Sequence, residues 1–351
     1  MPCGSAILIE LSTGRVLFEK DPDIPMPPAS ITKVMTLLLA MEALEDGKIT
    51  YEDTVTCSDE AASMGGSQIW FEPGEQMRVE ELIRAVAVVS ANDASVALGE
   101  YIAGSHGGFV TLMNQRAGEL GMTRTVFKNA TGLDDPEHVT TARDIATMSA
   151  ELLKHEDITK FTTIWMDELR GGDTLLVNTN KLVRFYEGAT GLKTGTTSKA
   201  GHCLSASARR NDMHLVAVVL GSDTSDQRFS AARGLLDYGF ANYELVTTPD
   251  LPGGAMPVKV SGGVEPEVPI VAGAPDTLLV PKGRGGDIEQ QVEMSAELAA
   301  PVAQGQIVGR VVLTLDGSEI ATYPLTAECD LAQMTFFSAM GVLFRELCSM
   351  S

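Results

Sequence analysis

The segment PPASITKVMTLLLAMEAL, residues 27–44, joins two prolines and a serine to a lysine and a long apolar run. The run predicts a buried helix that ends near Asp46–Gly47. Ser30 and Lys33 would share one face at the helix start, because residues three apart on a helix are neighbours. A serine becomes a nucleophile when a base takes its proton, and a lysine with a depressed pKa can act as that base. The helix start also offers free N–H groups to an oxyanion.

The same two residues have a purely structural interpretation. Ser30 belongs to a residue type that often caps helices, and Lys33 would then be a solvated residue of the first turn. A lysine in the first turn opposes the helix dipole, however, so its presence there needs a reason.

Two further short motifs carry groups of the same kind. SAN, residues 90–92, lies between two helical patterns and offers either a hydroxyl and an amide to a cleft or a cap to the next helix. KTG, residues 193–195, comes at the end of a predicted strand, and the structural alternative is a strand that ends in a turn. Together with Ser-x-x-Lys, these motifs occur once each, in the order that penicillin-recognising enzymes use.

The patterns around these motifs predict an α+β fold. SAILIEL and GRVLFEK, within residues 5–20, are short apolar runs joined by a Ser-Thr-Gly turn, and residues 79–154 are mostly helical in pattern. Three apolar runs between residues 190 and 222 predict strands, and a helical pattern follows them. This order of elements indicates a single sheet, which contains strands from residues 5–20 and strands from residues 190–222.

The composition changes near Thr247. A stretch rich in Pro and Gly leads to short alternating strands, with Asp316–Gly317 as a hairpin signal. We therefore expect three parts, which are a catalytic domain at residues 1–244, a small β-rich domain at 245–328 and an amphipathic helix at 329–351.

The chain resembles a known family over nearly its whole length. The three motifs, with the segments ILIELSTGRVLFEKDPD, NATGLDD, TARDIA and NTNKLVRFYEGATGLKTG, resemble the serine-type D-Ala-D-Ala carboxypeptidases. These are low-molecular-weight penicillin-binding proteins, and the closest similarity is to the type found in Gram-positive, often spore-forming bacteria. The resemblance implies a penicillin-binding/β-lactamase-like catalytic domain, in which an antiparallel sheet is flanked by helices and joined by a helical subdomain. A small β-rich domain would follow it.

The resemblance also implies an activity and its catalytic residues. The enzyme would remove the terminal D-alanine from peptidoglycan stem pentapeptides, and β-lactam antibiotics would acylate it. Ser30 would be the acylated nucleophile, Lys33 its base, and Ser90 a relay that carries the proton toward the leaving D-alanine. The backbone N–H groups of Ser30 and Thr196 would form the oxyanion hole. The residues alone leave open which lysine or serine moves each proton.

The remaining motif residues would bind substrate. By the same resemblance, Asn92 would hold the stem-peptide amide, and Lys193 and Thr194 would hold the terminal carboxylate. Gly195 has no side chain, so a ligand can approach the strand backbone there.

Charge and composition exclude several other classes. The net charge of −21 argues against nucleic acid and against electrostatic adhesion to anionic lipid, since both need clustered Lys and Arg. The five cysteines and five histidines show no ligand spacing, so we expect no metal, no cofactor and no disulfide framework.

The start of the chain conflicts with the resemblance. MPCGSAILIEL lacks the basic segment and long apolar core of a signal peptide, and no apolar run reaches the length of a transmembrane helix. We give the motifs more weight and expect an extracytoplasmic, membrane-associated enzyme whose signal peptide has been removed or is missing from this chain.

The C-terminal segment, residues 330–351, has an amphipathic helical pattern. Phe336, Met340, Leu343 and Leu347 share one face, with Phe337 beside them. We expect a membrane-surface anchor that works by apolar insertion, because the segment has almost no basic residues. The alternative is that this face packs on the β-rich domain or on a partner subunit.

Two other functions use similar motifs. A serine β-lactamase must hydrolyse its acyl-enzyme rapidly, usually through a dedicated glutamate, and no clear Glu-x-x-x-Asn element lies between Ser90 and Lys193. A non-catalytic sensor of peptidoglycan or β-lactams needs no nucleophile–base pair, so the intact Ser30 and Lys33 argue against it.

Overall fold

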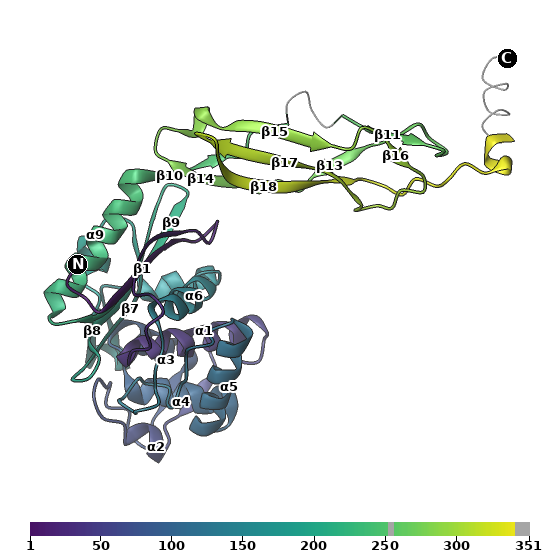
Figure 1. The fold of residues 1–351 in the computed structure, drawn as a ribbon. Coiled ribbons are helices and arrows are strands. Elements are labelled where there is room, and N and C mark those ends of the chain that lie inside the picture. Colours follow the sequence, from purple (N-terminus) through teal and green to yellow (C-terminus); the bar gives the residue numbers. More distant parts are fainter. Residues whose placement is uncertain (252–255, 341–351) are drawn as a thin grey trace. The chain divides into compact units, whose positions relative to one another are not determined.

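The structure, a computed structural model, describes residues 1–251 and 256–340 (Figure 1). The chain divides into two compact units, Met1–Asn242 and Tyr243–Ser351. This division falls two residues before the domain boundary that the sequence predicts at residue 244. Residues 341–351 of the predicted C-terminal helix lie outside the described residues.

A five-stranded antiparallel sheet in the order β2-β1-β9-β8-β7 forms the centre of the first unit. Its strands are β1 (Ser5–Glu10), β2 (Val16–Lys20), β7 (Ala189–Thr197), β8 (Gly201–Arg210) and β9 (Met213–Ser222). The prediction that the N-terminal hairpin and the Lys193 strand share one sheet is confirmed. β1 is buried along its whole length and β9 along most of it, because both faces of the sheet are covered, and this explains their nearly continuous apolar sequences.

Helices cover the two faces of this sheet (Figure 1). α9 (Ser225–Asn242) packs on β8 and β9, while α6 (Ala142–Leu152) packs on β1 and β9 from the other side. The predicted buried helix is α1 (Lys33–Glu45), which ends one residue before Asp46 and is buried on nearly all sides, as its uniformly apolar sequence requires.

The rest of the first unit is a mainly helical part that packs around α1. Its helices are α2 (Asp59–Ala62), α3 (Val79–Val88), α4 (Asn92–Ala103), α5 (His106–Glu119), α7 (Thr159–Thr162) and α8 (Leu182–Phe185). Two small hairpins accompany them, made by β3 (Thr54–Thr56) with β4 (Gln76–Arg78) and by β5 (Met166–Leu169) with β6 (Thr174–Val177).

The second unit is built from short strands. They form three sheets in the orders β10-β14, β12-β11-β16 and β13-β18-β17-β15. The strands are β10 (Tyr243–Thr247), β11 (Val258–Ser261), β12 (Glu267–Val268), β13 (Ile270–Ala272), β14 (Thr277–Pro281), β15 (Glu289–Met294), β16 (Leu298–Ala299), β17 (Ile307–Leu315) and β18 (Ser318–Ala327). Asp316 and Gly317, with φ of 52° and 73°, join β17 to β18, so the predicted hairpin is confirmed.

Each unit has its own apolar core, and the α+β fold class is confirmed. Three cysteines of the first unit, Cys3, Cys57 and Cys203, are buried free thiols. Among the described residues, no helix has the length and apolarity to cross a membrane. The same residues contain no group of three or more His, Cys, Asp or Glu side chains arranged to hold a metal ion.

Candidate active site

Ser30 lies in a tight turn that leads directly into α1. Residues Ala29–Thr32 form a 3-10 turn, and α1 begins at Lys33. Ala29 has a φ of 47°, in the left-handed region, so the backbone just before the serine is strained. No side-chain cap bond forms at this helix start. Ser30 is therefore not the helix cap that the structural interpretation required.

Gly132 packs closely against this turn. Its φ is 83°, and a Cβ added to it would lie 1.8 Å from Ala29 O and 2.9 Å from Ser30 N. A side chain of any size would displace the backbone that carries the serine. The NATG segment therefore has a direct structural role beside Ser30.

Thr32 and His138 form a chain of hydrogen bonds that ends at the backbone carbonyl of Ala29. The Thr32 hydroxyl donates to Ala29 O at 2.8 Å and lies 2.9 Å from His138 Nε2. Burial lowers the pKa of His138 to about 4, so its ring is neutral at pH 7. Because Lys128 N donates to its Nδ1 at 3.3 Å, Nε2 carries the hydrogen and donates to Thr32. No motif in the sequence indicates this chain of hydrogen bonds.

Lys33 is fully buried and touches Ser30. Its Nζ donates to Ser30 Oγ at 3.0 Å, to Asn92 Oδ1 at 2.6 Å and to Thr131 O at 2.6 Å. The interpretation of Lys33 as a solvated first-turn residue is wrong, because its exposed fraction is 0 %. The sequence could not reveal the contact to Thr131 O, since that partner lies 98 residues further along the chain.

The surroundings of Lys33 favour its neutral form. Burial, assisted by the nearby charge of Lys193, holds the pKa of Lys33 well below its ordinary value, while Asp93 opposes this shift. In the neutral amine, two N–H bonds serve Asn92 and Thr131, and the lone pair is left facing Ser30 Oγ. That arrangement allows the amine to accept the serine proton.

The two polar residues of the SAN loop, Ser90 and Asn92, differ in their hydrogen bonding. Asn92 accepts from Lys33 through Oδ1 and donates from Nδ2 to Gly65 O at 2.6 Å, so its amide holds both the Lys33 amine and a neighbouring loop. Ser90 has a φ of 66°, and its buried Oγ has no hydrogen-bond partner within the described part of the chain. No hydrogen bond links Ser90 to Ser30 or Lys33 there. A buried hydroxyl without a protein partner costs about 1–3 kcal/mol, so Ser90 Oγ has the capacity to bond to a water or a ligand.

The KTG motif lies within β7, and the expectation that it ends the strand is wrong. The ladder with β8 continues through Thr197, which pairs with Gly201. Lys193 is 1 % exposed and donates to Thr194 O at 3.1 Å. Burial, together with the charge of Arg228, lowers the pKa of Lys193 to about 7.

Gly195 brings this strand against the serine turn. A Cβ added to Gly195 would lie 3.0 Å from Ser30 N and 2.9 Å from Pro28 O. The structure thus brings the three motifs together, the first two by the Lys33–Asn92 hydrogen bond and the third by this close approach. Thr194 Oγ1 donates to Thr179 Oγ1 at 2.7 Å.

Arg228 of α9 is a site residue that the sequence analysis missed. Its Nη1 donates to Gly195 O and to Thr196 Oγ1, both at 2.9 Å, although the side chain is 7 % exposed. One signal was available, because Arg228 lies on the same helix face as the buried Ala232 and Leu235, where a charge needs a partner.

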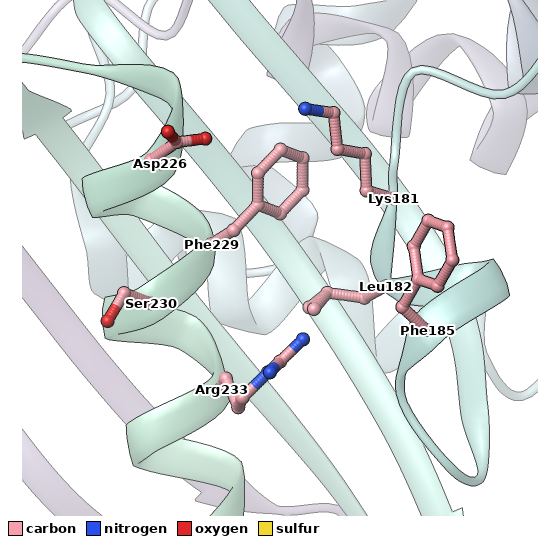
Figure 2. A pocket seen from close by; sticks show the side chains of 7 residues that line it. All are labelled: Lys181, Leu182, Phe185, Asp226, Phe229, Ser230 and Arg233. Carbon is pink, nitrogen blue, oxygen red and sulfur yellow. The ribbon is translucent and has the colours of Figure 1, made fainter.

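A cavity of about 310 Å³ lies between α8 and α9. Figure 2 shows its lining, which is Lys181, Leu182, Phe185, Asp226, Phe229, Ser230 and Arg233. None of the predicted site residues lines it. The position of the candidate active site is therefore fixed by the Ser30–Lys33 cluster and not by this cavity.

The fold and this geometry place a serine hydroxyl 3.0 Å from a buried lysine amine, an arrangement typical of serine hydrolases of the penicillin-binding class. Residues 1–224 match the family model of the S11 peptidases, D-alanyl-D-alanine carboxypeptidase, and residues 253–333 match the C-terminal domain of penicillin-binding protein 5. The chain belongs to this S11 family of D-alanyl-D-alanine carboxypeptidases.

Individual relatives agree with the family. The chain is 43% identical to the D-alanyl-D-alanine carboxypeptidase DacF of Bacillus subtilis, over 95% of this chain and 87% of that protein. Penicillin-binding protein 5 of Haemophilus influenzae has a TM-score of 0.87 at 33% identity, covering 95% of this chain and 98% of that one. The ampicillin-bound penicillin-binding protein D2 of Listeria monocytogenes has a TM-score of 0.63 at 29% identity, covering 68% of this chain and 98% of that one.

These findings confirm the predicted activity. The protein is a serine-type D-alanyl-D-alanine carboxypeptidase, a hydrolase of the penicillin-binding class that acts on peptidoglycan. The relatives named above are carboxypeptidases or penicillin-binding proteins, and none is named a β-lactamase or a sensor.

Proposed function

We propose that Ser30 is the nucleophile of this carboxypeptidase and Lys33 its general base. The observation that carries the proposal is the fully buried Lys33 amine, 3.0 Å from Ser30 Oγ, whose pKa is held low by burial. A neutral amine at this position can take the hydroxyl proton as Oγ attacks the carbonyl carbon between the two D-alanines. The negative charge that forms on the carbonyl oxygen is received by the N–H groups of Ser30 and Thr196.

The tetrahedral intermediate formed by this attack then collapses and releases the terminal D-alanine. The C–N bond breaks, the leaving amine takes a proton, and Ser30 is left as an ester of the shortened peptide. We assign the proton relay from Lys33 to the leaving amine to Ser90, because its buried hydroxyl has no other partner among the described residues. Water then hydrolyses the ester, with Lys33 again acting as base, and the serine hydroxyl is restored.

The substrate carboxylate is assigned to β7. Lys193 supplies a cation and Thr194 a hydroxyl, and Arg228 adds a second buried positive charge behind Gly195 and Thr196. Asn92 offers its amide to the stem peptide, at the cost of its bond to Gly65 O. The missing side chain of Gly195 lets β7 approach the Ser30 turn, which keeps the proposed carboxylate-binding residues close to the nucleophile.

Acylation by penicillin tests the nucleophile. The lactam amide mimics the D-Ala-D-Ala bond, but its leaving group stays tethered and blocks water, so the adduct should be long-lived. Mass spectrometry should show one added drug mass, absent in Ser30→Ala and retained in Ser198→Ala, an exposed serine near the site. Labelling of Ser30→Ala would place the nucleophile elsewhere, and rapid drug turnover would favour the β-lactamase interpretation.

Release of free D-alanine tests the reaction itself. A diacyl-D-Ala-D-Ala peptide should be converted by the wild type and by Ser198→Ala, and not by Ser30→Ala. An enzyme that binds penicillin but releases no D-alanine would support the sensor interpretation.

The second part of the proposal concerns location. We propose that the three predicted parts act as a catalytic domain (residues 1–244), a β-rich domain (245–328) and a membrane-surface helix (329–351) on the extracytoplasmic side. Phe336 and Phe337 support this, since residues 336–340 are helical and the two rings are 75 % and 83 % exposed. Neighbouring phenylalanines with such large exposed fractions are typical of segments that insert into lipid.

Co-sedimentation with neutral liposomes tests the anchor. Wild-type protein should pellet with phosphatidylcholine vesicles independently of salt, while Phe336→Ser/Phe337→Ser should stay in solution. A truncated protein that ends at Met334 is the second variant, because it keeps Leu331, which belongs to the β-rich core. Wild-type protein that stays in the supernatant would mean that the helix packs on protein instead.

A further inference from the structure

Trp70 is the most exposed large apolar side chain of the first unit, although the residues on both sides of it are buried. Its side chain is 77 % exposed, whereas Ile69 and Phe71 are each 2 % exposed. Its φ is 57°, in the left-handed region that bulky residues avoid. The backbone therefore adopts an unfavourable conformation that directs an indole ring into solvent, and such strain persists only where the surroundings enforce it.

A buried carboxylate enforces this conformation. Asp93, which is 1 % exposed, accepts from the backbone N–H groups of Ile69 and Phe71, both at 3.0 Å through Oδ2. The amides before and after Trp70 are thus bound to the same oxygen. These two buried, charge-assisted hydrogen bonds restrict the backbone conformation of the loop on both sides of Trp70.

Arg170 holds the same loop from its carbonyl side. Its guanidinium donates to Ile69 O at 2.9 Å and to Trp70 O at 3.3 Å, and it pairs through two nitrogens with Glu75. Backbone donors and acceptors around Trp70 are therefore both fixed. The ring is a preorganised platform, and binding a ligand there would require little further ordering of the loop.

The loop is also connected to the candidate active site. Asn92 donates from Nδ2 to Gly65 O at 2.6 Å and from its backbone N to Ser67 O at 2.7 Å, and Asp93 is the next residue in the chain. The loop that carries Trp70 is therefore hydrogen-bonded to Asn92, the residue that accepts from the Lys33 amine.

We propose that Trp70 is a stacking platform for a sugar ring of the peptidoglycan strand to which the stem peptide is attached. This rests on the proposed function, because the stem peptide must lie in the Ser30 site. A five-residue stem spans at most about 17 Å when extended, so the attached sugar lies within that distance of Ser30. The axial C–H bonds of a β-linked sugar make a flat apolar face that suits an indole ring, and its hydroxyls remain in water.

The charges near Trp70 favour a neutral saccharide over an anionic surface. Glu72 is exposed and Glu75 half-buried, and Arg170 is already engaged by Glu75. An anionic lipid or polymer would be repelled by these carboxylates and would find no free cation on the described part of this loop. A pyranose ring brings no charge to the site.

Kinetics with two substrates test the proposal. Trp70→Ala should lower kcat/KM for a disaccharide-pentapeptide about 10-fold through KM, and leave a glycan-free diacyl-D-Ala-D-Ala peptide and penicillin acylation within 2-fold. Trp70→Tyr should retain most of the activity on the disaccharide substrate. Phe185→Ala, another strongly exposed aromatic residue of the first unit, is the matched control and should change neither substrate.

Fluorescence gives a direct reading of binding. The chain has two tryptophans, so Trp165→Phe leaves Trp70 as the only emitter. A β-1,4-linked N-acetylglucosamine tetramer should shift the emission of this variant in a saturable way. No shift, together with equal losses on both substrates in Trp70→Ala, would overturn the proposal and make Trp70 a support of the site. A shift caused by neutral vesicles alone would make it a membrane contact. Loss of the proposed function itself would instead appear as a wild type without acylation at Ser30.

Discussion

The two units of the chain treat polar side chains in opposite ways. In the first unit, Lys33, Asp93, Lys193 and Arg228 are among many polar or charged groups that are buried. Among the described residues of the second unit, no charged side chain is buried, and its core consists of apolar residues such as Val311 together with Tyr323. Burying an unpaired charge lowers the free energy of unfolding. The many buried charges of the first unit therefore reduce its stability, and their use lies in catalysis.

The difference separates catalysis from support. Apolar burial contributes about 25 cal/mol per Å² and needs no exact partner, so a β-rich unit of alternating strands can be stable without buried polar groups. The first unit must place several charges around one hydroxyl, and each of them depends on partners that are distant in sequence. Perturbations of single polar atoms should therefore harm the first unit far more than the second.

The largest expected effect follows from removing the base. Lys33→Ala should lower the rate of penicillin acylation by roughly 10²–10⁴-fold, which is the usual contribution of general base catalysis. Far-UV circular dichroism should stay close to wild type, while the thermal transition of the first unit should fall modestly, because Asn92 Oδ1 and Thr131 O lose their buried donor. A variant that acylates at nearly the wild-type rate would remove Lys33 from its proposed role.

The second-largest expected effect is a difference in stability between alanine substitutions at two glycines with positive φ. Gly132→Ala places a Cβ 1.8 Å from Ala29 O and should destabilise the first unit by about 2–5 kcal/mol, through backbone strain and overpacking together. Gly317→Ala in the β17–β18 turn meets nothing within 4 Å and should cost the second unit only about 1–2 kcal/mol. Calorimetry that resolves two transitions measures both, and similar costs for the two variants would contradict the close approach at Gly132.

Acid should destabilise the first unit more than the second, because all five histidines belong to the first unit. Burial lowers the pKa of His138 and of His214 to about 4, while the unfolded chain holds these protons up to about pH 6.5. Stability from these groups is therefore complete above pH 6.5 and is lost as the pH falls toward 4, by roughly 3 kcal/mol for each histidine. The melting temperature of the first unit should fall over this window, and an equal fall in the second unit would refute the assignment.

The smallest expected effect concerns Lys193. Since burial lowers its pKa to about 7, the free enzyme loses this positive charge as the pH rises through 7. The second-order acylation rate for a carboxylate-bearing β-lactam should then fall above pH 7, by at most about 10-fold per pH unit. The methyl ester of the same drug should lack this alkaline decline, and an identical pH profile for both would mean that Lys193 does not hold the carboxylate.

Much of this site could be predicted from short motifs. Ser30 and Lys33 are three residues apart, so their contact follows from helix geometry, and the Asp316–Gly317 turn follows from local backbone chemistry. The shared sheet was predictable from the order of the patterns. These features depend on residues that are near in sequence or on the period of apolar residues.

The supporting residues were not predictable in the same way. His138, Gly132 and Arg228 act on Ser30 or on β7 from distant segments, and their types are common in loops and helices. Trp70 was unpredictable for another reason, because its left-handed backbone goes against its own preference and depends on Asp93. Only Arg228, a charge on an otherwise apolar helix face, left a signal in the sequence.

The buried thiols of the first unit have a consequence for oxidation. Burial raises the pKa of Cys57 and of Cys203 to about 11, so at pH 7 only about one molecule in 10⁴ carries either thiolate, the form that reacts with oxidants and disulfides. Folding thus protects these sulfurs in an oxidising compartment without any disulfide. The period of risk is the time before the core closes, when the same cysteines have ordinary thiol reactivity and can pair wrongly. Slower folding of the first unit therefore lengthens the time in which these thiols can be oxidised or mispaired.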